Sequence, residues 1–324
     1  MKQIFLLLII LACKPLFAQK RTVNFYREQE LLIPVEGGVS LSGTLTTPDS
    51  RDSNHLVAVI VAGSGPTDRD GNQAGIIYPN TYRFLAHDLA QKGVSVFRYD
   101  KRGVAASARA GSKEYKLTFD NYIQDLVACI SYLRERYHFR RAILIGHSEG
   151  ALISFIAGKK AQADGYIAIG APGSPIDTIL LGQIKERMPL LSAKAGTILS
   201  KLRNKETVDS VPRELTALFR HDVQPFLMTM MAYDPSREIA AIDAPVLIIQ
   251  GDNDLQIKMA ETDKLIKAKP AAMTAIIQHM NHVLKISEQD NNRNIQLYNS
   301  PATPISAAIA EHINVFIRKN NFVK

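Results

Sequence analysis

A serine stands between two glycines where a buried strand turns directly into a helix. The segment AILIGHSEGALISFIAGKK, residues 142–160, passes from an apolar strand pattern through GHSEG, residues 146–150, into a helical pattern without a loop. So abrupt a corner strains the backbone, and the glycines relieve crowding against the adjoining strand and helix. The Ser148 hydroxyl then projects above the sheet, beside helix N–H groups that favour negative charge. The pattern is typical of a nucleophilic serine, although a serine that only caps the helix would look similar locally.

A serine hydroxyl is a weak nucleophile, so this chemistry requires a base and an acid that orients the base. Both residue types follow later strand patterns. The run APVLIIQGDNDLQI ends in Asp252 and Asp254, and the run TAIIQHMNHVLK ends in His282. Either aspartate suits the role of acid at this point. His279 is expected to lie on the strand and to pack there.

The elements around these residues predict a parallel sheet covered by helices on both faces. Near-continuous apolar runs, typical of strands buried on both faces, cover residues 55–63, 94–100, 142–146, 166–170 and 244–251. Helical patterns alternate with them at residues 80–92, 119–137, 148–160 and 258–267. A hairpin that turns at Gly37 and Gly38 adds an antiparallel edge. The segment from about residue 174 to residue 240 has helical patterns and no strand pattern, which predicts a helical cap over the ends of the strands.

These elements resemble the α/β-hydrolase family, specifically its cap-bearing serine esterases and serine-aminopeptidase-like hydrolases. The resemblance extends over nearly all of residues 19–324. It implies an α/β fold with a mostly parallel central sheet, helices on both faces and a cap. In that family the acid ends a G-x-x-D pattern, which points to Asp254, and the base follows an asparagine, which points to His282. The resemblance thus implies a triad of Ser148, His282 and Asp254 that works through an acyl-enzyme and needs no cofactor.

The same resemblance implies an oxyanion hole of two backbone N–H groups. One would come from Glu149, and the other from Ser64, at a turn where the family usually has His-Gly. The loop GSGPTDRDG that follows resembles a loop in a branch of bacterial esterases, in which Arg69 or Asp70 would either line the substrate site or brace the loop.

The segment FRYDKRGVAAS resembles a family motif that contains an aspartate and an arginine after a strand. Its Asp100 and Arg102 are expected to form a structural salt bridge rather than a catalytic pair.

The first residues have the pattern of a signal peptide. A basic start and a short apolar run precede Ala18, so residues 1–18 are expected to be removed and the protein to be periplasmic or secreted. Alternatively, Cys13 is lipidated and anchors the protein to a membrane. No later segment is long and apolar enough to be a transmembrane helix. Cys129, the one cysteine inside the domain, has no partner there for a disulfide and is expected to be buried.

Composition narrows the remaining classes of function. The 324 residues are 46% hydrophobic and 22% charged, which is ordinary for a globular domain. The net charge of +8 is spread along the chain without the Lys/Arg run and interleaved aromatic residues of nucleic-acid binding. No His, Cys and Asp spacing is typical of a zinc site, so no metal is expected.

The resemblance implies hydrolysis of a small carboxylic ester, and the plentiful Leu, Met and Phe of the cap segment favour a substrate that is partly apolar. Two alternatives keep the same scaffold: a thioester hydrolase, and an aminopeptidase whose cap would offer Glu206, Asp209 or Glu214 to a substrate ammonium. A non-catalytic binding protein is the alternative of a different class.

Overall fold

The computed structural model describes residues 25–49, 55–111 and 117–323. The predicted signal peptide, residues 1–18, and the possible lipidation site Cys13 lie outside the described residues. Among the helices that are described, none has the length and apolarity required to cross a membrane.

The described part of the chain builds an eight-stranded sheet in the order β1-β2-β4-β3-β5-β6-β7-β8. The first two strands, β1 and β2, form an antiparallel hairpin, and β2 is also antiparallel to β4. All other neighbouring strands are parallel. The predicted antiparallel edge is therefore confirmed. The strands are β1 (Tyr26–Val35), β2 (Val39–Pro48), β3 (Leu56–Val61), β4 (Ser95–Tyr99), β5 (Arg141–His147), β6 (Gly165–Ile169), β7 (Val246–Gly251) and β8 (Met273–Ile277).

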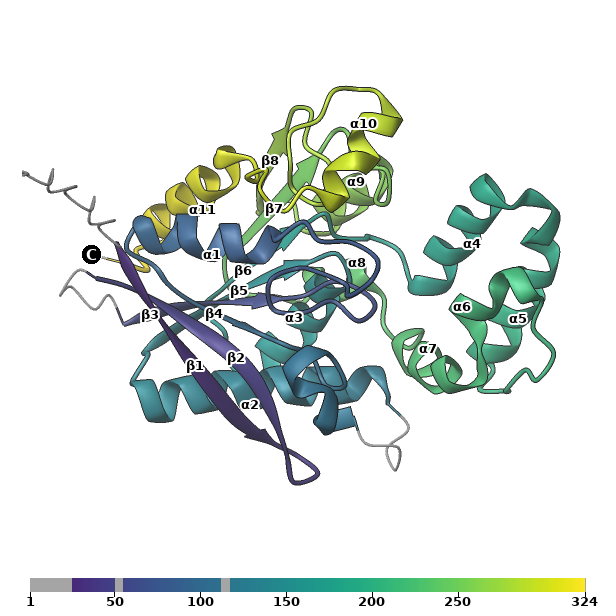
Figure 1. The fold of residues 1–324 in the computed structure, drawn as a ribbon, viewed down its shortest axis with the longest axis horizontal. Helices are drawn as coiled ribbons and strands as arrows, with labels where there is room; N and C mark the ends of the chain where they lie inside the picture. Colours follow the sequence, from purple (N-terminus) through teal and green to yellow (C-terminus); the bar gives the residue numbers. More distant parts are fainter. Residues whose placement is uncertain (1–24, 50–54, 112–116, 324) are drawn as a thin grey trace, which may run out of the picture.

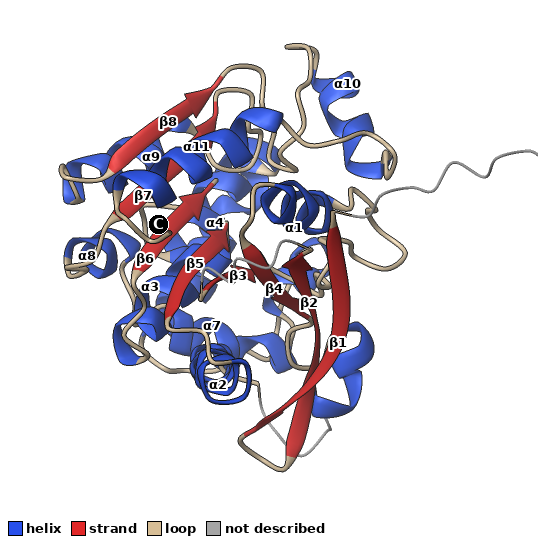
Figure 2. Cartoon of the chain, turned by 90° about the vertical axis from the view of Figure 1, so that its left-hand side faces the viewer, coloured by secondary structure: helices blue, strands red, loops and turns tan. Residues whose placement is uncertain are grey.

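Helices cover both faces of this sheet (Figure 2). On one face pack α1 (Thr81–Gln91) and α11 (Ala307–Lys319), and on the other pack α2 (Phe119–Tyr137), α3 (Glu149–Lys160), α8 (Pro235–Ala240) and α9 (Met259–Ala268). The central strand β3 shows why the apolar runs are continuous. Val57 and Val59 enter the core on one face, while Ala58 and Ile60 enter the core on the other.

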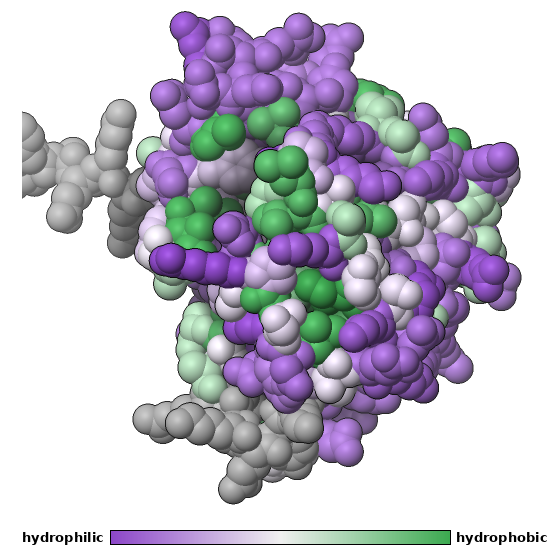
Figure 3. Space-filling view, turned by 90° about the vertical axis from the view of Figure 1, so that its right-hand side faces the viewer, coloured by the Kyte–Doolittle hydropathy of each residue, from purple (hydrophilic) through white to green (hydrophobic). Residues whose placement is uncertain are grey.

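A group of helices after β6 stands apart from the sheet and forms the cap (Figure 1). It contains α4 (Ile176–Arg187), α5 (Ser192–Arg203), α6 (Thr216–Phe219) and α7 (Gln224–Met230). These helices share a hydrophobic core of their own, which includes Ile184, Ile198, Leu202 and Phe219. Helix α8, although it lies within the segment predicted as cap, packs against α3 and α9 of the main body. Seen from the cap side, the surface carries apolar patches among hydrophilic residues (Figure 3).

Cys129 lies on α2 and is fully buried in the core. Burial raises the pKa of its thiol well above the ordinary value. The thiol therefore stays protonated and packs as a small apolar side chain.

Candidate active site

The corner between β5 and α3 holds Ser148 in a strained conformation. Its φ of 53° and ψ of −123° lie in a region that residues with side chains rarely adopt. The flanking glycines are required sterically: a Cβ on Gly146 would lie 2.4 Å from the Ala151 Cα, and a Cβ on Gly150 would lie 2.1 Å from the Val61 carbonyl oxygen. Ser148 makes no side-chain capping hydrogen bond to its helix, so its hydroxyl is not used as an N-cap.

The loops after β7 and β8 bring Asp254 and His282 together. The His282 Nδ1 lies 2.8 Å from the Asp254 Oδ2. The other carboxylate oxygen, Oδ1, accepts hydrogen bonds from the backbone N–H groups of Gln256, at 2.7 Å, and Ile257, at 2.9 Å. Burial alone would raise the pKa of Asp254, but the facing His282 and these hydrogen bonds outweigh burial and lower it. Asp254 is therefore an ionised acceptor that holds the His282 ring with its Nδ1 protonated and its Nε2 free.

The two competing residues of this region lie elsewhere. Asp252 is exposed, and its carboxylate accepts a hydrogen bond from the backbone N–H of His279 at 2.6 Å. His279 itself is exposed in the turn after β8, with a φ of 59°, and does not lie on the strand as expected. It faces solvent because the strand ends two residues earlier, at Ile277.

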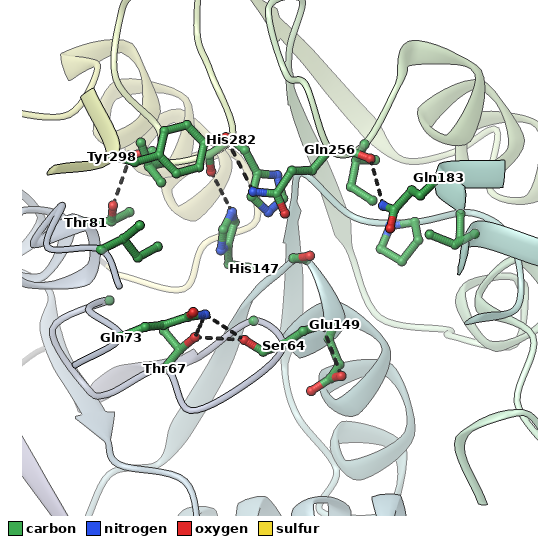
Figure 4. Close-up of a pocket in the computed structure, with 18 of the residues that line it drawn as sticks. Ser64, Thr67, Gln73, Thr81, His147, Glu149, Gln183, Gln256, His282 and Tyr298 are labelled. Atoms are coloured by element: carbon green, nitrogen blue, oxygen red, sulfur yellow. Dashed lines mark hydrogen bonds between the residues drawn. The ribbon is translucent and has the colours of Figure 1, made fainter. Parts of the chain in front are cut away.

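Ser148 and His282 line one pocket, with a volume of about 280 Å³, between the sheet and the cap. Figure 4 shows the loop after β3, with Ser64, Thr67 and Gln73, on the side of the pocket opposite His282 and Tyr298. The cap contributes apolar side chains to the wall, among them Ile176, Ile179, Leu180 and Leu218. Of the residues that line the pocket, Glu149 is the only carboxylate and none is a lysine or arginine. The pocket therefore suits an uncharged and partly apolar molecule.

The residues expected to form the oxyanion hole meet beside Ser148. An ideal Cβ on Gly63, the residue before Ser64, would lie 3.3 Å from the Ser148 Cβ, so the loop after β3 closely approaches the serine. The Ser64 hydroxyl donates to the Glu149 Oε2 at 3.1 Å. Both residues line the pocket (Figure 4).

A buried hydrogen-bond chain through Tyr82 and His147 connects three loops of the site. The Gly63 N–H donates to the Tyr82 hydroxyl at 3.0 Å, and that hydroxyl lies 2.8 Å from the His147 Nδ1. The His147 Nε2 lies 2.9 Å from the His282 carbonyl oxygen, which can only accept. His147 is therefore neutral, with its proton on Nε2, and the Tyr82 hydroxyl donates to Nδ1. Burial, assisted by the neighbouring His282, lowers the pKa of His147 to about 3.

Both ring nitrogens of His147 are thus used in hydrogen bonds inside the corner. Tyr82, however, is not among the residues that the sequence indicates. Its signal is weak, because an aromatic residue in the first turn of a core helix usually only packs.

Arg69 and Asp70 are structural rather than part of the pocket wall. The Arg69 guanidinium forms an ion pair with Asp100, at 2.8 Å, and contacts Glu30 of β1. The Asp70 carboxylate accepts a hydrogen bond from Arg98 of β4 at 3.0 Å. Neither residue lines the pocket. They brace the loop after β3 against the antiparallel edge of the sheet, which is the second of the two roles expected for them.

Asp100 and Arg102 do not pair with each other. Asp100 pairs with Arg69, while the Arg102 guanidinium pairs with Asp125 of α2 at 2.5 Å. The expected Asp100–Arg102 salt bridge is therefore wrong, although both side chains are structural as anticipated. Their partners lie on different elements, because Arg69 belongs to the loop after β3 and Asp125 to α2.

The cap offers no acidic group to the pocket. Glu206, Asp209 and Glu214 are all exposed, and none of them lines the pocket. The arrangement that an aminopeptidase would need to hold a substrate ammonium is thus not formed by these residues.

Residues 78–290 match the family model described as serine aminopeptidase, S33, and this match covers more than half of the 324 residues. The chain belongs to the serine aminopeptidase S33 family. Together with the sheet order and the covering helices, this confirms the predicted α/β-hydrolase fold.

Relatives of this S33 member include esterase EstD from Thermotoga maritima, 27% identical over 254 residues, which are 75% of this chain and 58% of the relative. A monoglyceride lipase homolog from Monkeypox virus is 27% identical over 192 residues, 53% of this chain and 65% of the relative. The chain spans less than two thirds of the length of both relatives.

Solved structures show the same fold at low sequence identity. An esterase from Pyrococcus furiosus superposes with a TM-score of 0.58 at 17% identity, and the match covers 91% of this chain and 93% of the esterase. Est1E from Butyrivibrio proteoclasticus superposes with a TM-score of 0.59 at 15% identity, and the match covers 90% of this chain and 98% of Est1E. At these identities the likeness concerns the fold alone.

Proposed function

We propose that this protein hydrolyses carboxylic esters, with Ser148 as the nucleophile, His282 as the general base and Asp254 as the group that orients the base. The observation that carries this proposal is the strained serine, free of any capping bond, in one pocket with a histidine whose other nitrogen is held by a buried carboxylate. The esterase EstD, to which the chain is similar, supports the same reaction class.

In the proposed reaction each of these groups has its own step. The Ser148 oxygen attacks the ester carbonyl carbon while the His282 Nε2 takes the serine proton. The backbone N–H groups of Ser64 and Glu149 stabilise the oxyanion that forms. The protonated His282 then gives its proton to the leaving alcohol, which departs and leaves an acyl-enzyme. A water molecule attacks that acyl group with its proton again passing to His282, and the carboxylic acid leaves as Ser148 is restored.

The pocket favours uncharged esters over peptides with a free amino terminus. An ammonium group needs a carboxylate whose charge is not already paired. The one carboxylate in the wall, Glu149, already faces Lys101 at 3.5 Å and accepts from Ser64. The apolar side chains of α4 instead offer a surface for an acyl chain or an apolar alcohol.

The proposal is tested by comparing the parent protein with Ser148→Ala on p-nitrophenyl butyrate and on leucine p-nitroanilide. We expect ester hydrolysis by the parent, and a loss of about a thousandfold or more in Ser148→Ala at unchanged melting temperature. A fluorophosphonate should add to the parent once, with the adduct mapped to Ser148 by peptide mass spectrometry. Equal ester turnover by the two proteins would refute the assignment of Ser148, and faster turnover of the anilide would replace ester hydrolysis by aminopeptidase activity.

A further inference from the structure

A lysine is buried directly behind the proposed oxyanion hole. Lys101 follows β4, and its side chain is 1% exposed. Its ammonium donates to the Gly63 carbonyl oxygen at 2.5 Å, lies 3.5 Å from the Glu149 Oε1 and lies 5.0 Å from the centroid of the Tyr122 ring. Removing an ammonium from water is costly unless it is paired and hydrogen-bonded. A buried lysine of this kind is therefore expected to have a role in positioning the groups that it contacts, in addition to packing.

The contact with Gly63 controls the direction of the Ser64 N–H. The Gly63 carbonyl and the Ser64 N–H belong to the same peptide unit, and in a planar trans peptide they point in opposite directions. When Lys101 holds the carbonyl from behind, the N–H is held toward the opposite side. A donor on the carbonyl also polarises the peptide, which strengthens its N–H as a hydrogen-bond donor.

The Lys101 ammonium also contacts Glu149, the residue whose backbone N–H is the second proposed donor of the oxyanion hole. Glu149, which would contribute its own backbone N–H to the oxyanion, faces Lys101 through Oε1 and accepts from Ser64 through Oε2. Its side chain is 5% exposed. The residues that carry both N–H groups are thus joined through one buried ammonium (Figure 4 shows Ser64 and Glu149).

We infer that Lys101 is a positioning residue for the oxyanion hole, which holds the Gly63–Ser64 peptide and Glu149 in the orientation that stabilises the tetrahedral intermediate. The inference rests on the ester hydrolysis proposed above. It predicts an effect on the chemical step rather than on substrate binding, because an oxyanion hole acts on charge that develops only in the transition state.

Lys101→Met tests this role, and Arg102→Met is its matched control. Arg102 is the next residue, and its side chain, which is 3% exposed, likewise forms a buried ion pair. Its partner Asp125 lies on α2 and does not line the pocket. With p-nitrophenyl butyrate, Lys101→Met should lower kcat by at least about tenfold with KM within about threefold of the parent value. It should also weaken inhibition by butylboronic acid, whose boron accepts the Ser148 oxygen to give a tetrahedral anion, by a similar factor. Arg102→Met should lower the melting temperature and leave kcat within about threefold.

A double variant separates positioning from folding. Lys101→Met leaves the Glu149 carboxylate buried without its counter-ion, and Lys101→Met with Glu149→Gln removes that charge. The double variant should regain melting temperature while kcat stays low, because the Gly63 carbonyl still lacks its donor. Recovery of kcat together with melting temperature, or equal kcat losses in Lys101→Met and Arg102→Met, would overturn the inference. A parent protein without ester turnover or fluorophosphonate labelling would instead refute the proposed function itself.

Discussion

Asp254→Asn is a sharp test of the proposed triad, because the structure dictates how an asparagine would sit. The Asp254 Oδ1 accepts two backbone N–H groups, from Gln256 and Ile257. An asparagine must place its oxygen there, since its NH₂ group cannot accept these bonds. The NH₂ group then faces the His282 Nδ1 and donates to it. His282 is forced into the tautomer with the proton on Nε2, which cannot take the proton of Ser148.

The expected loss in kcat is about 10⁴-fold, which corresponds to about 5 kcal/mol of transition-state stabilisation. Fold stability should change far less, by about 1 to 2 kcal/mol, because both backbone donors stay paired. The assay is kcat and KM for p-nitrophenyl butyrate, together with urea unfolding of the same samples.

Asp252→Asn is the matched control, since that carboxylate is exposed and contacts the backbone of His279 instead of His282. It should keep kcat within about threefold of the parent. If Asp254→Asn retained more than about a tenth of the parent kcat, or if Asp252→Asn lost as much activity, the reasoning about the acid would be refuted.

Two further predictions concern the corner itself. The folded-state pKa of His147, about 3, lies below its unfolded value of 6.5, so between these values protons bind only the unfolded chain and favour unfolding. The parent should lose about 2 kcal/mol from this residue between pH 7 and pH 5. His147→Gln should lack that loss in urea unfolding at the two pH values, and parallel losses would contradict the assignment. Ser148→Gly should raise the free energy of unfolding by about 1 kcal/mol relative to Ser148→Ala, because only glycine adopts the positive φ without strain. Equal stability of these two variants would show that the corner stores no strain.

The sequence predicts the main body well wherever local pattern and burial agree. The strands β3 to β7 fall within or beside the predicted apolar runs, and α2 has the predicted bounds, Phe119–Tyr137. The glycines around Ser148 indicate the corner because no other residue fits there. Helix α11 is absent from the predicted helices, although its buried Ile309, Ile313 and Phe316 have helical spacing.

The contacts that depend on distant segments were not predictable in the same way. Lys101 reaches Gly63 only because β4 lies beside β3, and Tyr82 reaches it because α1 packs against the same sheet. A sequence pattern cannot distinguish a lysine that turns inward from one that stays in solvent. The same reason explains Arg69: the sequence shows a charged loop next to the site, but only the fold shows that β1 and Asp100 hold its guanidinium.

The cap has a hydrophobic core of its own, so the cap and the main body of this protein can change in sequence independently. The cap folds around its own apolar side chains, while the proposed nucleophile, base and acid all belong to the main body. Changes on the inner surface of α4 can therefore alter which molecules fit without moving the reacting groups. Relatives with this architecture can therefore differ in substrate through substitutions in the cap, while selection keeps Ser148, His282 and Asp254 unchanged.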